Sequence, residues 1–376
     1  MIRVDRRHFE NFDFVLLLLI LLVCGMALFN LYSASYPPKP YGTPPYLKQA
    51  YFFLMGAACC LFILSFDYND LHIWNYPFYF SVVILLLLSY VVGSKAGGAQ
   101  RWIDLGFFNL QPSEPAKLML VISLASYYSR KEVIDGYNLK QLIMPILLTG
   151  LPFLLILMQP DLGTALMLGI IFVSMTLFVK VKFSTIATLG STALAVVVIA
   201  WEKLLRPYQK QRIQTFLNPE QDVMGSGYQI FQSKIAVGSG GKFGKGYMEG
   251  TQGHLHFLPE RHTDFAFSVW GEEWGFVGCL FFLGCYFSML LWGLYVAMNA
   301  RDRFGVLLAY GIVMLIFWQA VINLLMILGF LPVVGIPLPL VSYGGSSLLT
   351  TVAALGILMN VRMRRFQTHN PQARST

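Results

Sequence analysis

The amino-acid sequence predicts an all-α integral membrane protein, a polytopic bundle of about ten transmembrane helices. Of its 376 residues, 56% are hydrophobic and 12% are charged, whereas a soluble domain carries about 25% charged residues. The mean hydropathy is +0.60. The apolar residues gather into runs long enough to cross a bilayer, and one large polar segment, residues 202–264, separates the seventh run from the eighth.

The first apolar run, residues 14–31, follows three arginines and so resembles a secretory signal. Its 18 residues exceed the roughly 7–15 of a signal core, so we expect an uncleaved first span. The other spans are predicted at residues 47–66, 74–93, 115–129, 139–158, 162–179, 184–201, 267–298, 304–329 and 346–361. The fourth is short and opens with charged residues, which makes it the least like an ordinary transmembrane helix.

Basic residues set the expected orientation, because cytoplasmic loops carry an excess of lysine and arginine. With the N-terminus in the cytoplasm, thirteen Lys and Arg residues fall on cytoplasmic segments and four on the short outer segments. Both termini, including the tail 362–376, are therefore expected in the cytoplasm, with a large outer loop at 202–264. The net charge of +8 is then a signal of topology and does not indicate nucleic-acid binding.

Ionisable residues at membrane depth are costly and are therefore functional candidates. The first cluster holds Arg101, Glu114 and Lys117, with Ser113 as an expected helix cap. Glu114 and Lys117 are three residues apart, so they share a helix face and can form a structural ion pair. The functional alternative is that Arg101 and Lys117 contact an anionic ligand that enters from the outer leaflet.

The second cluster is the segment 159–164, where Pro160 interrupts an apolar run and Asp161 begins the next one. The simple interpretation makes Asp161 the N-cap of that helix, with Thr164 at its third position. The alternative is that this break faces an outer cavity, where Asp161 lends a polar group to a substrate.

The third cluster lies in the polar segment 202–264, which carries eight basic residues, six acidic residues and nine glycines. We expect a long structureless loop, and such loops are usually functional. It contains Arg212, Lys234 and the glycine-rich stretch 238–246. That stretch matches neither the P-loop nor the dinucleotide-binding fingerprint. It is either a flexible loop or a place where backbone amides approach a phosphate.

The fourth cluster surrounds Asp264, where the polar segment meets the eighth apolar run. A carboxylate there is partly desolvated, which raises its pKa toward that of a useful general base. Asp264 could instead be only the N-cap of the span. Glu272 and Glu273 lie two turns further on and either support the site electrostatically or mark the membrane interface. His254 and His256 form a lone His-x-His, which is too weak a pattern to predict a metal site built by the protein alone.

The last candidate segment, 332–346, separates the final two spans and carries three prolines and no charge. Such a loop can re-enter the membrane only where protein or a water-filled cavity covers it. We therefore expect it to form one wall of a cavity, with Ser342 as a candidate substrate contact.

Taken in order, these motifs resemble those of the SEDS family (shape, elongation, division and sporulation). The resemblance runs from the first span to the last. The sequence of residues 259–264, Pro-Glu-Arg-His-Thr-Asp, resembles that of the elongation branch of the family rather than that of the division branch. The other matching motifs are Arg101-Trp102, 111–114 with Lys117, 159–164, 227–246, 257–265 and 337–346.

The resemblance implies a ten-span peptidoglycan glycosyltransferase in the bacterial cytoplasmic (inner) membrane. It would polymerise lipid II into undecaprenyl-linked glycan outside that membrane, for cell-wall elongation and rod shape. The implied partner is a class B penicillin-binding protein, the transpeptidase of the elongation machinery. In the family, the aspartate that matches Asp264 is the essential catalytic residue.

As a mechanistic hypothesis, Asp264 deprotonates the GlcNAc 4-hydroxyl of one lipid II, which attacks the anomeric carbon of the growing strand. The anomeric configuration inverts, so a single base is enough. Arg101, Lys117, Arg212 or Lys234 would stabilise the leaving undecaprenyl pyrophosphate, with a divalent cation such as Mg²⁺ or Mn²⁺ as a candidate helper. Glu114, Asp161 and Ser342 are further candidate substrate contacts.

Two other functions remain open from the sequence. A lipid II flippase also explains many spans and intramembrane charge, but it should carry ionisable groups near the midplane that both sides can reach. A scaffold for the penicillin-binding protein would need no chemistry of its own.

Overall fold

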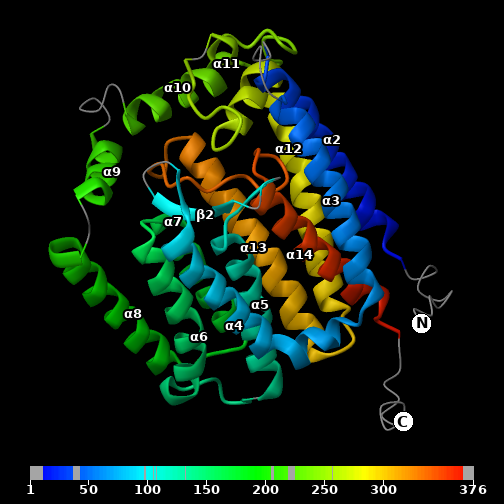
Figure 1. The fold of residues 1–376 in the computed structure, drawn as a ribbon, viewed down its shortest axis with the longest axis vertical. Helices are drawn as coiled ribbons and strands as arrows, with labels where there is room; N and C mark the ends of the chain where they lie inside the picture. The colour runs from blue at the N-terminus through cyan, green and yellow to red at the C-terminus, as the bar shows by residue number, and fades with distance from the viewer. Residues whose placement is uncertain are drawn as a thin grey trace.

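The structure, a computed structural model, describes residues 12–36, 43–96, 99–104, 106, 108–131, 133–204, 207–218, 225–255 and 257–366. Each of the ten predicted spans corresponds to a helix of one bundle (Figure 1). These helices are α2 (Phe14–Ala34), α3 (Pro45–Ser65), α4 (Tyr68–Val92), α5 (Ser113–Arg130), α6 (Leu139–Met158), α7 (Leu162–Phe178), α8 (Phe183–Ile199), α12 (Ala266–Met298), α13 (Arg303–Ile327) and α14 (Gly345–Met363).

Among the described residues, eight helical stretches are long and apolar enough to cross a membrane by themselves. The other two spans are α7, which has 17 residues, and α5, which opens with charge as the sequence indicates. Helix α4 begins at Tyr68, six residues before the predicted start at 74, because Asp67 caps its first turn by accepting from Asn69 N at 2.9 Å.

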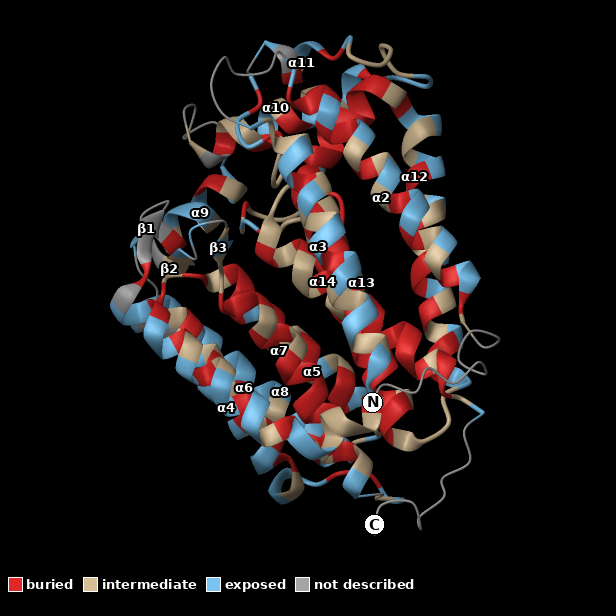
Figure 2. Cartoon of the chain, turned by 45° about the vertical axis from the view of Figure 1, so that its right-hand side comes forward, coloured by how far each residue is buried: buried red, intermediate tan, exposed pale blue. Residues whose placement is uncertain are grey.

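The core of the bundle lies around α13 and α14 (Figure 2). In their most apolar windows, 61% of α13 and 72% of α14 are buried within the protein, against 6% for the stretch that contains α8. An apolar helix that stays this exposed needs lipid rather than protein around it. Helix α8 accordingly lies at the periphery of the bundle (Figure 1).

Acidic side chains start several of these helices by accepting a hydrogen bond from a backbone N–H in the first turn. Asp13 accepts from Leu16 N at 3.0 Å, and Asp302 accepts from Gly305 N at 2.7 Å. The expected cap of α5 is wrong. Ser113 is the first residue of that helix, and its buried hydroxyl has no hydrogen-bond partner within the described part of the chain.

The polar segment between α8 and α12 is not a structureless loop, contrary to expectation. It contains the π-helical turn η1 (Ala200–Leu204) and the helices α9 (Pro207–Leu217), α10 (Ser226–Ser239) and α11 (Thr251–His254). The Ser233 hydroxyl anchors α10, because it donates to Ile327 O at 2.9 Å and lies 2.9 Å from the Ser268 hydroxyl. Helices α10 and α11 therefore cover one end of the bundle (Figure 1). His256 lies outside the described residues.

A small antiparallel sheet between α4 and α5 was not predicted. It consists of β1 (Ser94–Ala96), β2 (Ala99–Asp104) and β3 (Asn109–Leu110), in the order β1-β2-β3. Ile103 pairs with Leu110 in the register of β2 and β3. This sheet holds Arg101 at the end of the bundle where α5 and α7 begin.

Helix α12 is broken at Gly275, whose φ of 63° and ψ of −162° are not helical. A break removes hydrogen bonds from the helix ladder, and in lipid each lost bond must be replaced. The glycine-rich stretch replaces them from both sides of the break. Gly241 O accepts from Phe276 N at 2.9 Å and Lys242 O from Val277 N at 3.0 Å, while Lys245 N and Gly246 N donate to Glu272 O and Glu273 O.

We call residues 240–246 the splint of α12. The close approach explains its glycines, since a Cβ at Gly240 would lie 2.1 Å from Gly271 O and one at Gly244 would lie 2.0 Å from Glu273 O. The Trp270 indole also bridges the break by donating to Gly278 O at 3.0 Å. Two of the splint's amides, those of Lys245 and Gly246, donate to α12, and those of Gly241 and Gly244 donate within the stretch 238–244, so these four are not available to a phosphate.

Replacing Gly275 by alanine should destabilise the protein strongly. The new Cβ would lie 2.2 Å from Gly244 N, and the backbone would remain in the left-handed region that favours glycine. We expect a loss of about 3 kcal/mol or more, measured as thermal unfolding of the purified protein in detergent. Gly284→Ala is the matched control on the same helix, because nothing lies within 4 Å of its Cβ position. Equal melting temperatures for the two variants would contradict the splint.

Candidate active site

Three segments that are distant in the sequence are joined around Asp264. The Asn323 side chain on α13 donates both to Asp264 O and to Ile336 O, each at 2.9 Å. A second hydrogen bond joins the same two segments, since Tyr343 N donates to His262 O at 2.8 Å. The segment 257–265 is thereby fixed against the loop 332–344, in which Leu338 and Leu340 are buried within the protein. That this loop forms one wall of a cavity stays a prediction.

The carboxylate of Asp264 does not cap α12. The capping position belongs to Phe265, which makes no side-chain cap hydrogen bond. Within the described residues, the Asp264 carboxylate accepts no hydrogen bond and stays only half-buried. Gly335 leaves room beside it, since a Cβ there would lie 3.7 Å from Asp264 Oδ2. The simple capping interpretation of Asp264 is therefore wrong.

Burial raises the pKa of Asp264 to about 6, because loss of water disfavours the charged form. The negative charge of Glu260 adds to the rise in this pKa, and the positive charges of Arg101 and Arg212 oppose it. The carboxylate is therefore ionised near neutral pH while remaining basic enough to take a proton. Arg101 lies on β2 and Arg212 on α9, so each of these two elements places one positive charge near the Asp264 carboxylate.

Arg101 is held in place by Asp161 at the start of α7. Its Nη1 lies 3.1 Å from Asp161 Oδ2, and Gln111 donates to the same oxygen at 3.3 Å. The other oxygen, Oδ1, accepts from Thr164 N at 3.1 Å as an N-cap. Asp161 thus caps α7 with one oxygen, as the simple interpretation predicts, and orients Arg101 with the other, while its contact with a substrate stays a prediction.

Glu114 and Lys117 form the ion pair that their spacing indicates, with Lys117 Nζ 2.9 Å from Glu114 Oε1. Their side chains are only 5% and 3% exposed, so this pair is buried in the first turn of α5. A role in contacting substrate stays a prediction for both residues.

Glu272 supports the splint and its continuation. Its carboxylate accepts from Lys245 Nζ at 2.7 Å, from Thr251 N at 2.8 Å and from Gln252 N at 3.1 Å. Glu273 accepts a hydrogen bond from the Ser33 hydroxyl on α2. Neither glutamate contributes to the shifted pKa of Asp264. Both glutamates therefore act through hydrogen bonds to neighbouring segments, and not through their charge at Asp264.

Lys234 is exposed on α10 and lies beside Gly329, and its contact with substrate stays a prediction. Ser342 is occupied within its own loop. The Ser342 hydroxyl accepts from Leu338 N at 2.9 Å, and its carbonyl accepts from the Gln49 side chain at 3.1 Å. Ser342 thus closes a turn of its own loop, and its contact with substrate stays a prediction.

The sequence analysis missed Arg261, which lies in the same motif as Asp264. Arg261 is only 7% exposed, and burial lowers the pKa of its guanidinium. Among the described residues it forms no ion pair or hydrogen bond, and its Nη1 is buried without an acceptor. A buried cation without a partner is costly and signals a missing anion. No sequence pattern distinguishes it from an arginine at the surface.

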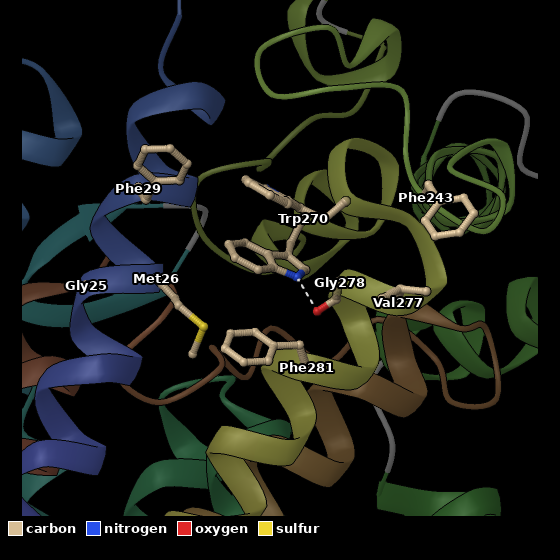
Figure 3. Close-up of a pocket in the computed structure, with 9 residues that line it drawn as sticks. Gly25, Met26, Phe29, Phe243, Trp270, Val277, Gly278 and Phe281 are labelled. Atoms are coloured by element: carbon tan, nitrogen blue, oxygen red, sulfur yellow. Dashed lines mark hydrogen bonds between the residues drawn. The ribbon is translucent and has the colours of Figure 1, made fainter.

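A separate apolar groove of about 630 Å³ lies between α2 and α12 (Figure 3). Met26 and Phe29 face Trp270 and Phe281 across it. It contains none of the charged candidates, so its chemistry suits a hydrocarbon chain rather than a reaction. In the described part of the chain, no group of three or more His, Cys, Asp or Glu side chains could hold a metal ion.

Comparison with known proteins places these features in context. A family model for the FtsW/RodA/SpoVE cell cycle proteins matches residues 14–367. The Escherichia coli (strain K12) protein named peptidoglycan glycosyltransferase MrdB is 41% identical over 292 residues, which cover 78% of each of the two chains.

Two solved structures are similar over most of this chain. One, described as structural coordination of polymerization and crosslinking by a peptidoglycan synthase complex, has a TM-score of 0.81 and 34% identity, and the match covers 95% of this chain and 99% of that one. The crystal structure of the Thermus thermophilus rod shape determining protein RodA has a TM-score of 0.70 and 30% identity, with 95% and 98% covered.

The two buried cations of the site should respond oppositely to replacement by methionine. Arg261→Met removes an unpaired buried charge and should raise the free energy of unfolding by about 1 kcal/mol or more. Lys117→Met leaves Glu114 buried and unpaired, which should cost about 3–5 kcal/mol. Thermal unfolding in detergent measures both effects. If Arg261→Met destabilises the protein as much as Lys117→Met does, Arg261 has a partner and the inference of a missing anion is wrong.

Proposed function

Because this chain belongs to the FtsW/RodA/SpoVE family, we propose that it polymerises lipid II with Asp264 as the general base. The chain is a peptidoglycan glycosyltransferase and a multi-pass protein of the bacterial inner membrane. Its similarity to MrdB and RodA agrees with the resemblance of residues 259–264 to the elongation branch of the family. The substrate, the role of each residue and the orientation in the membrane are parts of the proposal.

One observation carries the assignment of the base. Asp264 is a partly buried carboxylate at this end of the bundle whose oxygens accept no hydrogen bond and form no ion pair among the described residues, whereas the neighbouring Glu260 is exposed and accepts from the Thr263 hydroxyl at 2.9 Å. Asp161 holds Arg101, Glu114 holds Lys117, and Glu272 holds the outer segment. A base must have a free lone pair within reach of the substrate proton, and Asp264 meets this need.

In the proposed step, the GlcNAc 4-hydroxyl of one lipid II gives its proton to the Asp264 carboxylate. Its oxygen forms a bond to the anomeric carbon of the lipid-linked strand. The bond between that carbon and the phosphate oxygen breaks, and undecaprenyl pyrophosphate leaves with the electron pair. The configuration at the carbon inverts, so no covalent enzyme intermediate is needed.

Cations are needed where the negative charge of the pyrophosphate develops. Arg101 and Arg212 are close enough to Asp264 to lower its pKa, which supports their role on the phosphates. Arg261 has a buried Nη1 without an acceptor but is not among the charges that shift the pKa of Asp264, so it is a weaker candidate for the phosphates than Arg101 and Arg212. Lys117 and Lys234 are weaker candidates, because one is paired with Glu114 and the other lies against Gly329. A divalent cation would add charge stabilisation if the substrate phosphates bring one.

The proposed partner is a class B penicillin-binding protein, and the similar structure of a peptidoglycan synthase complex supports this. With the N-terminus in the cytoplasm, Asp264, the sheet and α10 all lie on the outer side. Polymerisation and crosslinking would then occur on the same face of the membrane.

Asp264→Asn should abolish glycan formation by the detergent-purified chain supplied with lipid II and, if required, its partner. Asparagine keeps the shape of the side chain but cannot take the proton. Glycan strands separated on a gel are the measurement, and production by the wild-type chain without any membrane excludes a flippase as the only activity. Full activity of Asp264→Asn would remove Asp264 as the base, and a blank wild-type reaction even with the partner would favour a scaffold.

The pH profile should report the same carboxylate. Since Asp264 must be ionised, kcat/KM should fall tenfold per pH unit below about 6. The folded state holds this proton more tightly than the unfolded chain. Protonation of Asp264 therefore stabilises the folded state, fully below pH about 4, and this contribution is lost as the pH rises through about 6. Asp264→Asn should therefore melt at a higher temperature than wild type at pH 8, with the difference shrinking toward pH 5. An activity that stays flat from pH 8 to 5 would contradict the assignment.

A further inference from the structure

A fully buried asparagine ties Asp264 to the loop opposite it. Asn323 lies on α13 and is 0% exposed, and its Nδ2 donates one hydrogen bond to Asp264 O and one to Ile336 O, each at 2.9 Å. Its Oδ1 is buried and has no hydrogen-bond partner within the described part of the chain. A buried polar group that stays partly unsatisfied costs free energy. An apolar residue would pack here without that cost, so the amide is explained by what its two hydrogen bonds hold.

The backbone around Asp264 is anchored, whereas its carboxylate is not. Asn30 on α2 is 1% exposed and donates to Ala266 O at 2.8 Å, just beyond Asp264 in the chain. The Asp264 carboxylate accepts no hydrogen bond among the described residues. Its position therefore depends on how the backbone is held, and Asn323 holds the carbonyl of Asp264 itself.

The second hydrogen bond of Asn323 fixes a loop that lies directly against α7. Gly163, in the first turn of α7, leaves so little room that a Cβ there would lie 2.6 Å from Val334 O and 3.4 Å from Ile336 Cγ1. Close-packed groups of this kind transmit a displacement instead of absorbing it. The loop and the start of α7 are therefore coupled in position.

The start of α7 in turn holds Arg101. Asp161 caps this helix and lies 3.1 Å from Arg101 Nη1. The positive charge of Arg101 acts on the Asp264 carboxylate, because it opposes the rise in pKa that burial causes there. Asn323 thus lies where the backbone of the proposed base meets the support of a cation proposed to bind the phosphates.

We propose that Asn323 is a positioning residue for the glycosyl transfer, whose two hydrogen bonds set the place of the Asp264 carboxylate relative to Arg101. This inference rests on the proposed function of Asp264, and it gives the fully buried Asn323 no contact with substrate. The acceptor hydroxyl must reach the base while the leaving phosphates reach the cations. A displacement of about 1 Å between these groups can cost about 100-fold in rate.

Asn323→Leu removes both hydrogen bonds and keeps a side chain of similar size. With lipid II as substrate, kcat should fall about 100-fold while KM changes little, because the geometry of the reacting groups is lost and substrate binding is not. Asn360→Leu is the matched control. Asn360 on α14 is 1% exposed, and its Nδ2 likewise donates to two backbone carbonyls, Ile63 O at 2.8 Å and Phe66 O at 2.7 Å. This control should lose stability in the same way and keep the wild-type kcat.

A second measurement does not depend on catalysis. At pH 8, Asp264→Asn should raise the melting temperature, because it removes the cost of an ionised buried carboxylate. Burial is the largest cause of the raised pKa of Asp264, Glu260 adds to it, and Arg101 and Arg212 oppose it. Without its tie, Asp264 gains water and its pKa falls from about 6 toward about 4. The gain from Asp264→Asn should therefore shrink in the Asn323→Leu background and persist in the Asn360→Leu background.

These comparisons separate the position of Asp264 from its chemistry. A kcat of Asn323→Leu equal to that of the Asn360→Leu control would overturn the proposal, and so would an unchanged gain in melting temperature. An unchanged gain with an inactive Asp264→Asn contradicts the role of Asn323 alone, whereas full activity of Asp264→Asn contradicts the proposed base. Asn323→Ser is the milder second variant, since its hydroxyl can donate to only one of the two carbonyls. Its kcat should lie between those of wild type and Asn323→Leu.

Discussion

The candidate active site depends on how the chain repairs the break in α12. A transmembrane helix that opens its ladder at Gly275 must find other partners for the freed amides and carbonyls, because lipid offers none. The splint provides them from a segment some thirty residues earlier in the chain. This repair lets the first turns of α12, with Asp264 just before them, take a direction that a straight helix could not. Glu272 also couples α11 to the same helix, and the Ser233 hydroxyl of α10 meets Ser268 of that helix.

The electrostatics of the site follow from which carboxylates are committed. Asp161 and Glu114 each hold a cation at short distance, so they contribute fixed structure and little free negative charge. Asp264 keeps its oxygens available and feels its cations only from further away. That difference supports the proposed role of Asp264 as the base, while Asp161 and Glu114 position the cations beside them. Arg261 is buried, and its Nη1 has no hydrogen-bond partner among the described residues, so its positive charge is free to pair with an anion.

The sequence predicted the ten helices and the position of Asp264 well, because long apolar runs and a polar segment ending in a carboxylate are local patterns. It did not predict the sheet at Ser94–Ala96, Ala99–Asp104 and Asn109–Leu110, whose strands are too short to show alternation. It missed the helical character of Ser226–Ser239, where glycines and polar residues at both ends suggested a loop. The splint could not be inferred either, since its hydrogen bonds join residues distant in the chain. The burial of Arg261 arises from tertiary packing alone.

The order of the splint and the break along the chain bears on biogenesis. Residues 240–246 leave the ribosome before Gly275 does, so the partner of the broken helix exists before the helix itself is made. With the proposed orientation, that partner has already crossed the membrane when α12 enters it. The broken helix can then close against its splint during insertion, and its unpaired backbone groups need not meet the hydrocarbon at any stage.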